Sequence, residues 1–180
     1  GVSNEGNDRF WGPRGILVAP DGNVYITDTG NRRAVVFDSQ GKYLFTFDTN
    51  GDAQLNEPVG IALGQDQHIY VADTWNNRVA IFDMQGKYLS SFPVEAWTST
   101  SVDDKPFIAV DGEGRVYVTD PEGARVIVFS ATGEPLAAFG QTVTSGGLNL
   151  PTGIQINAQG EVYIADAGNN RLVVYPSLKP

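Results

Sequence analysis

The chain has 180 residues, of which 41% are hydrophobic and 18% charged, and its net charge is -9 with an isoelectric point near 4.4. Binding to phosphates depends on clustered Lys and Arg, so this acidic composition excludes nucleic acid as an expected partner. The sequence contains no cysteine, which excludes disulfides and thiolate metal sites, and no apolar run approaches the roughly 18 residues that suggest a membrane span.

A five-residue pattern organises the rest of the sequence. It recurs at intervals of 45 to 47 residues, and in each copy an arginine lies five positions after the closing aspartate. Repeats of this period are typical of folds in which each unit buries its apolar face only against the next unit. The four copies are Val24–Asp28 with Arg33, Ile69–Asp73 with Arg78, Val116–Asp120 with Arg125, and Val162–Asp166 with Arg171.

Short strands are predicted in each repeat, in chain order after a polar, glycine-rich loop over residues 1–12. They are β-branched or aromatic runs separated by turn signals such as Pro20-Asp21-Gly22. The predicted strands are Gly15–Val18, Val24–Thr27, Ala34–Phe37 and Tyr43–Phe47; Gly60–Leu63, Ile69–Ala72, Val79–Phe82 and Tyr88–Phe92; Phe107–Val110, Val116–Thr119, Val126–Phe129 and Leu136–Phe139; and Gly153–Ile156, Val162–Ala165 and Leu172–Tyr175.

The last repeat lacks a fourth strand, and by alignment Gly1 falls just after the position of such a strand. Because the sequence also starts without Met, we expect a processed or excised segment that begins in mid-repeat. The missing strand would leave an open sheet edge, which has to be covered, charged or paired. Self-association through this edge is therefore one expected property of the chain.

Four antiparallel strands per repeat predict an all-β fold, a β-propeller in which each repeat forms one blade. One domain over residues 1–180 should contain blades at about 13–47, 58–92, 106–139 and 151–180, joined by inter-blade loops of which residues 1–12 are one. The last blade should lack its outer strand. The tyrosines that recur at one position are expected in the core between blades; they are Tyr25, Tyr70, Tyr117 and Tyr163.

The repeat unit resembles the NHL repeat. Its characteristic segments are Pro-x-Gly-Ile, then Asp-Gly-x-Val-Tyr-Ile-x-Asp, then Gly-Asn-x-Arg-x-x-Val-Phe-Asp, then Gly-Lys-Tyr-Leu. The resemblance implies blades stacked around an axis, usually six of them. Four copies leave three alternatives. The chain is an arc of a longer propeller, which we favour, or its ring is closed by another chain, or it forms an unusual four-bladed ring.

The repeated aspartates and arginines could place carboxylates around a central metal or substrate. Their presence in every repeat favours a structural role instead, in which the aspartate ends the second strand, accepts amide hydrogens of its own loop and pairs with the arginine across the hairpin. Hydrolase, phosphate-binding and His or Cys metal motifs are absent, and His68 is the single histidine. We therefore predict no catalytic residue, metal ligand or cofactor, although 21 acidic residues leave calcium open.

The loop after the second strand differs between repeats and should share one face of the disc with the long inter-blade loops. Trp75 is not needed for its turn and is the best candidate contact residue, with packing over a neighbouring loop as the alternative. The segment Pro93–Lys105, which contains Trp97, is the inter-blade loop whose sequence differs most from the others. The variable loops are Thr29–Arg32, Thr74–Asn77, Pro121–Ala124 and Ala167–Asn170, and the candidate partner-binding residues are Trp75, Asn76, Asn31, Glu122, Asn169 and Trp97.

These observations predict a non-enzymatic binding or scaffold module that contacts a protein, a peptide or a glycan through the variable loops. The resemblance also implies an alternative, a lactonase- or lyase-like enzyme with a divalent metal in the axial channel, although relatives with lyase activity use histidine ligands. A third possibility is a subunit that docks into a larger assembly by its open edge. We expect no membrane insertion of this segment, and favour an extracytoplasmic bacterial location.

Overall fold

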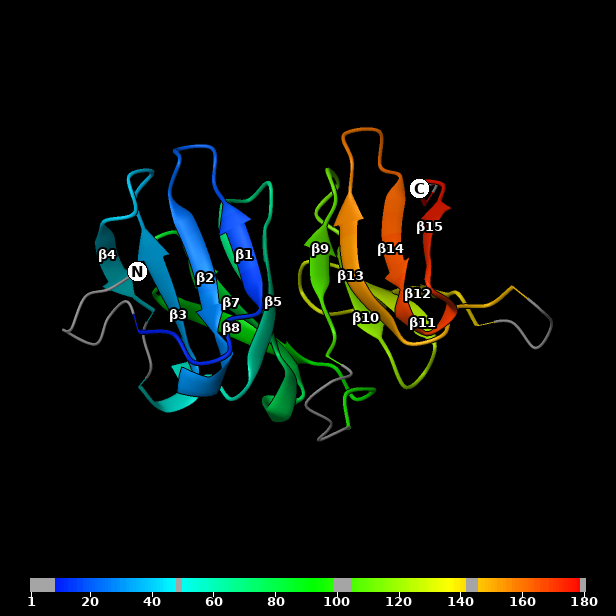
Figure 1. The fold of residues 1–180 in the computed structure, drawn as a ribbon, viewed down its shortest axis with the longest axis horizontal. Helices are drawn as coiled ribbons and strands as arrows, with labels where there is room; N and C mark the ends of the chain where they lie inside the picture. Colours follow the sequence, from blue (N-terminus) through cyan, green and yellow to red (C-terminus); the bar gives the residue numbers. More distant parts are fainter. Residues whose placement is uncertain (1–8, 48–49, 99–104, 142–145, 179–180) are drawn as a thin grey trace.

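A computed structural model describes residues 9–47, 50–98, 105–141 and 146–178, and it contains four antiparallel sheets (Figure 1). Each predicted strand is present, and the last blade has three strands, as predicted. The strands are β1 Gly15–Val18, β2 Val24–Asp28, β3 Arg33–Phe37 and β4 Tyr43–Thr46 in blade 1; β5 Pro58–Leu63, β6 His68–Asp73, β7 Arg78–Asp83 and β8 Tyr88–Pro93 in blade 2; β9 Ile108–Val110, β10 Val116–Asp120, β11 Arg125–Phe129 and β12 Pro135–Phe139 in blade 3; and β13 Pro151–Ile156, β14 Val162–Asp166 and β15 Arg171–Tyr175 in blade 4.

Within each blade, consecutive strands pair with their neighbours in sequence order, because short turns suit antiparallel hairpins. The turn between β1 and β2 uses Gly22 at a φ of 87°, a conformation that glycine adopts without a Cβ clash. In blades 1, 2 and 4 the connection after the second strand is a three-residue 3-10 helix: η1 (Thr29–Asn31), η3 (Thr74–Asn76) or η4 (Ala167–Asn169). These connections are short and tightly held, so they present side chains from fixed positions.

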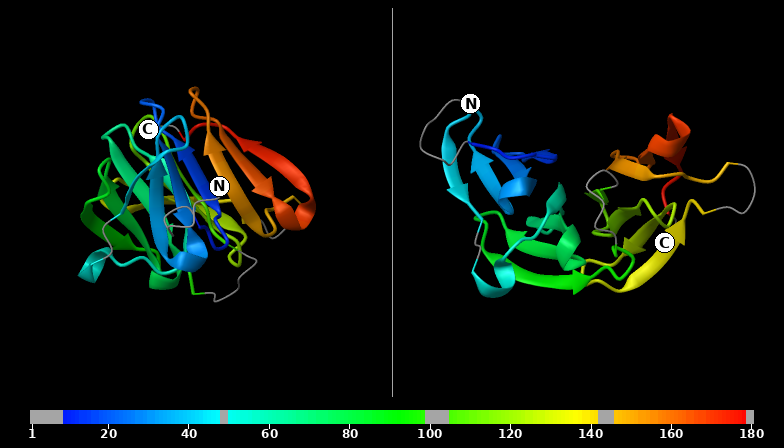
Figure 2. Two further views of the ribbon diagram at one scale, coloured as in Figure 1. Left: turned by 60° about the vertical axis from the view of Figure 1, so that its left-hand side comes forward. Right: turned by 60° about the horizontal axis from the view of Figure 1, so that its bottom comes forward.

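The four sheets follow one another around a common centre as an open arc (Figure 2). The innermost strands β1, β5, β9 and β13 all contribute side chains to one central depression. Apolar side chains fill the space between successive blades: Tyr25 of blade 1, for example, packs in one cluster with Ile69 and Val71 of blade 2. Burial of these faces is the main stabilising contribution, since a single four-stranded sheet has no dry interior of its own.

Three of the four repeated tyrosines confirm the predicted inter-blade core. Tyr25, Tyr70 and Tyr117 are each 1% exposed. Tyr163 is only half-buried, which corrects the prediction for the fourth repeat. The physical reason is that the side of blade 4 on which it lies is not covered by another blade in the described part of the chain.

Replacing Gly60 with alanine should destabilise the fold, because the inner strands of blades 2 and 3 approach closely at this residue. A Cβ on Gly60 would lie 2.7 Å from the amide nitrogen of Ile108 and 2.9 Å from Cα of Phe107. Backbone atoms can relieve such contacts only by moving the strands apart, and we expect a loss of about 1–3 kcal/mol in the free energy of unfolding. Urea titration followed by circular dichroism would measure this loss.

Gly153 is the matched control for this substitution, because it occupies the same repeat position in blade 4. A Cβ there would meet only the Cβ of Ala165, at 3.7 Å. Gly153→Ala should therefore be neutral, or stabilise by a few tenths of a kcal/mol through the unfolded state. Equal losses for the two variants would contradict the close-approach argument.

The helices in the described residues are single 3-10 turns, and none of them is long or apolar enough to cross a membrane.

Candidate functional site

A repeated set of hydrogen bonds, which we call the latch, holds the loop after the second strand in blades 1, 2 and 4. In blade 2 the buried carboxylate of Asp73 accepts hydrogen bonds from Arg78 Nε and Asn76 Nδ2, each at 2.7 Å, and from the amide of Asn56 at 2.6 Å. Asn76 Nδ2 and Arg78 Nη2 also donate to the carbonyl of Gln54, each at 3.0 Å. The latch therefore fastens the inter-blade loop to the end of β6.

The structural interpretation of the Asp–Arg pairs is thereby confirmed, with one correction. We expected each aspartate to accept amide hydrogens of its own loop; among the described residues only Asp120 accepts a backbone amide of that loop, from Gly123 at 3.0 Å. In the other blades the amide belongs to the preceding inter-blade loop, because that loop lies directly against the end of the second strand. The three donors are Trp11 to Asp28 at 2.7 Å, Asn56 to Asp73 at 2.6 Å, and Asn149 to Asp166 at 2.6 Å.

Three of the predicted contact residues are members of the latches. Asn31, Asn76 and Asn169 each donate from Nδ2 to the latch aspartate at 2.7–2.8 Å, and also to a carbonyl of the inter-blade loop at 3.0–3.1 Å. Both hydrogens of each amide are thus engaged within the protein. This assigns the three asparagines a structural role that the sequence analysis did not foresee.

Burial and hydrogen bonding act in opposite directions on the pKa of Asp73 and of Asp166. In Asp73, burial raises the pKa and outweighs the hydrogen bonds from Asn56, Asn76 and Arg78, which lower it. In Asp166 burial also raises the pKa, but it is weaker, and the equivalent bonds from Asn149, Asn169 and Arg171 hold the pKa below its ordinary value. The same chemistry therefore has a different electrostatic balance in a central blade and in the last blade.

Blade 3 departs from the latch. The position of the latch asparagine is taken by Gly123, and the loop begins with Pro121 and Glu122. Asp120 is 2% exposed and pairs with Arg125 Nε at 2.7 Å, so it does not need the asparagine to satisfy its charge. The loop of blade 3 is consequently free to present different side chains.

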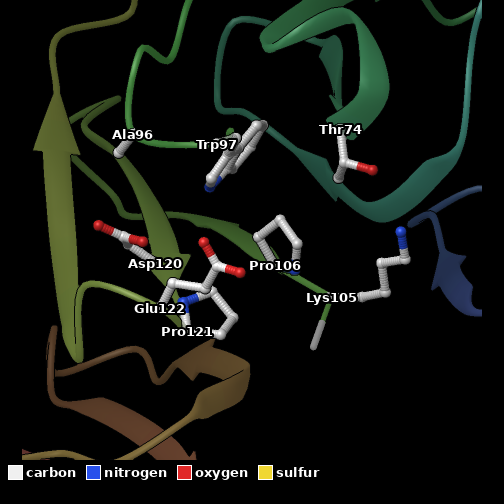
Figure 3. Close-up of a pocket in the computed structure, with 8 residues that line it drawn as sticks. All are labelled: Thr74, Ala96, Trp97, Lys105, Pro106, Asp120, Pro121 and Glu122. Atoms are coloured by element: carbon white, nitrogen blue, oxygen red, sulfur yellow. The ribbon is translucent and has the colours of Figure 1, made fainter. Parts of the chain in front are cut away.

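These side chains border a small depression of about 20 Å³ between the loops of blades 2 and 3 (Figure 3). Its apolar walls come from Trp97, Pro106 and Pro121, and Glu122 lines the same depression (Figure 3). Glu122 is exposed and has no recorded ion-pair partner among the described residues. The depression is lined by Thr74, Ala96, Trp97, Lys105, Pro106, Asp120, Pro121 and Glu122.

Trp97, a predicted contact residue, is largely buried and forms a wall of this depression. Its side chain is 5% exposed, and its indole nitrogen donates to the carbonyl of Thr119 at 3.0 Å. The ring packs in the apolar cluster between blades 2 and 3. Since its polar atom is satisfied by the backbone, Trp97 fixes the described residues before it, 94–97, over the end of β10.

Lys105 is the main residue of the site that sequence reasoning missed. Its side chain is buried, its ammonium nitrogen lies 3.2 Å from Glu57 Oε1, and it stands over the Trp75 ring at 5.0 Å from the centroid. The Pro93–Lys105 segment lacks the glycine pattern of the other inter-blade loops, and this departure was the signal in the sequence that could have led to Lys105. A buried ammonium held by one carboxylate and one aromatic face is a rigid arrangement.

Trp75 lies beside this depression, half-buried, with its indole nitrogen buried and without a hydrogen-bond partner among the described residues. The structure thus brings Trp75, Trp97 and Glu122 to one region. It leaves Asn31 and Asn169 in the latches of blades 1 and 4.

Metal-binding groups of three or more His, Cys, Asp or Glu residues do not occur in the described part of the chain. His68 lies on the surface, with Nδ1 2.8 Å from Asp66 Oδ2.

Comparisons with known proteins agree with the architecture. The model of the NHL repeat matches residues 10–41, 55–82 and 148–175. NHL-repeat-containing protein 4 from Homo sapiens is 32% identical over 83 residues, which are 46% of this chain and 63% of that protein. Protein brain tumor from Drosophila melanogaster is 28% identical over 134 residues, 73% of this chain and 13% of that protein.

Among solved structures, a virginiamycin B lyase from Staphylococcus aureus with quinupristin aligns with a TM-score of 0.64 at 19% sequence identity. The alignment covers 91% of this chain and 55% of the lyase chain. At this level of identity the likeness concerns the fold alone. The repeat matches, the latch in three blades and the stacked antiparallel sheets lead to one conclusion: the chain is a β-propeller whose repeats match the NHL repeat.

Proposed function

We propose that this protein is a non-enzymatic binding module that holds a segment of a partner protein at the depression between the loops of blades 2 and 3. The observation that carries the proposal is the exposed Glu122 at the rim of an apolar depression, in the blade whose loop lacks the latch asparagine. The other blades use the equivalent loop position to fasten their own structure. Blade 3 therefore has a loop that is available for recognition.

The chemistry of the depression favours a segment with a basic residue next to an apolar one. Trp97, Pro106 and Pro121 offer apolar walls, and Glu122 offers an exposed carboxylate at the rim. Lys105 and Asp120 are each paired within the protein and would keep their partners. The net charge of -9 would also attract a basic segment over a longer distance.

A random peptide library displayed on phage would test this proposal. Selected peptides should carry Lys or Arg beside an apolar residue, and Glu122→Gln should weaken their binding by about 0.5–1 kcal/mol, measured by calorimetry. Trp75→Ala should weaken it by about 1–2 kcal/mol, because the half-buried ring keeps part of its surface exposed for contact. The binding of wild-type protein should also weaken as salt is raised, and the Glu122→Gln variant should show less of this dependence.

Glu134→Gln is the matched control, because Glu134 is an exposed glutamate on the turn before β12, outside the depression. It should bind the same peptides as the wild type does. Equal weakening by the Glu122 and Glu134 variants would show a general charge effect and contradict a site at blade 3. A tightly held, stoichiometric Ca²⁺ or Zn²⁺ in the purified chain, or selection of a glycan and no peptide, would also overturn the proposal.

A further inference from the structure

The arginine of the Asp–Arg pair in blade 3 differs from its counterparts in the other blades. In blades 1, 2 and 4 the Nη2 atom of the equivalent arginine donates to a backbone carbonyl of the preceding inter-blade loop, at 2.8–3.1 Å. Arg125 donates from Nε to Asp120 at 2.7 Å, and its two Nη atoms have no recorded acceptor among the described residues. One edge of a planar group of donors is therefore left for another acceptor in blade 3.

Arg125 also lines a groove of about 340 Å³ between the end of β8 in blade 2 and the β11–β12 hairpin of blade 3. The surface of this groove is mainly apolar, with Pro93 on one side and Ile127 and Pro135 on the other. Glu95, which is exposed, is the second charged residue that lines it. Both walls belong to four-stranded sheets in the interior of the arc.

Blade 2 shows which kind of segment occupies the equivalent position there. The carbonyl that accepts from Arg78 belongs to Gln54, whose backbone is extended, with a φ of -61° and a ψ of 116°. The neighbours of this residue, Ala53 and Leu55, are buried in one apolar cluster with Ala80. In blade 2 the arginine thus binds the central carbonyl of an extended segment that has an apolar residue on each side.

The residue two places after the arginine shows how blade 3 differs. Ala80 of blade 2 is completely buried, whereas the equivalent Ile127 of blade 3 is half-buried although its side chain is larger. The hairpin registers establish this equivalence, since Ala80 pairs with Val71 and Ile127 pairs with Val118. Burying the exposed part of an isoleucine is favourable, so a segment that covers Ile127 would be stabilised by this contact.

We propose that the groove binds an extended peptide segment of a partner protein, in which two apolar residues flank a residue whose backbone carbonyl accepts from Arg125 Nη. The apolar side chains contact Ile127 and the two prolines of the groove. Because a carbonyl carries no net charge, the carboxylate of Glu95 does not repel it. The groove adjoins the depression described above, since Ala96 lines both, but the two sites use different charged residues and can be tested separately.

Linear peptides selected from a phage-displayed library on the purified chain would test this site. Peptides that bind the groove should share two apolar residues separated by one position. Arg125→Lys leaves a cation beside Asp120 and removes the Nη edge, so it should weaken their binding about tenfold. Ile127→Ala should weaken it as well, and Glu122→Gln should leave it unchanged. Arg171→Lys is the matched control, because it removes the same donors in blade 4, and it should bind these peptides as the wild type does.

Urea unfolding of the two lysine variants supplies a measurement that needs no ligand. Arg171→Lys should lower the free energy of unfolding more than Arg125→Lys, because it loses the bonds from Nη2 to the carbonyls of Gly146 and Gly147. Exposure alone would predict the opposite order, since the Arg171 side chain is 40% exposed and that of Arg125 is 33% exposed.

Two results would overturn the assignment of the groove. If Arg125→Lys is as destabilising as Arg171→Lys, the Nη edge is already satisfied within the chain. If no selected peptide distinguishes Arg125→Lys from the wild type, the groove is not a binding site. Peptides that depend on Glu122 and not on Arg125 would give this second result while leaving the function proposed above in place.

Discussion

Replacing Tyr70 with alanine should lower the free energy of unfolding by about 3–5 kcal/mol, since it removes a large, fully buried side chain. Tyr70 is 1% exposed and packs in the apolar cluster between blades 2 and 3. Its hydroxyl donates to Asp66 Oδ2 at 2.8 Å. Burial and this contact with the carboxylate raise the pKa of Tyr70, so the hydroxyl stays protonated and keeps its role as a donor. The loss would be measured by urea unfolding.

Tyr163→Ala is the control for Tyr70→Ala, because the same repeat position lies at the uncovered end of the arc. Its side chain is half-buried, and we expect a loss of about 1–2 kcal/mol at concentrations where the chain is monomeric. Tyr70→Phe would separate the contribution of the hydroxyl from that of the ring, and it should lower the free energy of unfolding by about 1 kcal/mol. Similar losses for Tyr70→Ala and Tyr163→Ala would contradict the arrangement in which a neighbouring blade covers Tyr70 but not Tyr163.

Replacing Asp73 with alanine should be nearly as damaging, with an expected loss of about 3–5 kcal/mol. The carboxylate is completely buried, and its removal leaves the mostly buried Arg78 without its ion-pair partner. The amide of Asn56 and the side-chain amide of Asn76 would also lose an acceptor. Because burial already raises the pKa of Asp73, the pair itself adds little stability, and the large cost comes from the groups left unpaired.

The control is Asp166→Ala, which breaks the equivalent latch in blade 4. The Arg171 side chain is 40% exposed, compared with 16% for Arg78, so water can solvate the guanidinium after its partner is removed. We expect a loss of about 1–2 kcal/mol from urea unfolding. If Asp166→Ala were the more damaging variant, burial could not be what determines the cost of breaking a latch.

The strands, the blades and the structural role of the Asp–Arg pairs could be predicted from the sequence because they depend on local patterns. Alternating apolar residues bounded by turn signals specify a strand within five or six residues, as in Val24–Asp28, which forms β2. The repetition then indicates which residue has the same task in every blade. The arginine lies opposite its aspartate in the register of each hairpin, for example Asp73 opposite Arg78. A contact of this kind follows from the short distance along the chain.

Only the tertiary structure decided the remaining features, because they join segments that are distant in sequence. Asn76 was predicted as a contact residue, and only the structure shows that its side-chain amide also reaches Gln54, 22 residues earlier. Trp97 was named only as a candidate contact residue, and the structure shows in addition that its indole donates to Thr119, 22 residues later. Lys105 is recognisable as part of a site only when Glu57 and Trp75 lie beside it. Repetition along a chain specifies which surfaces can bury one another, whereas the stacking of the blades determines which of these surfaces remain exposed to water.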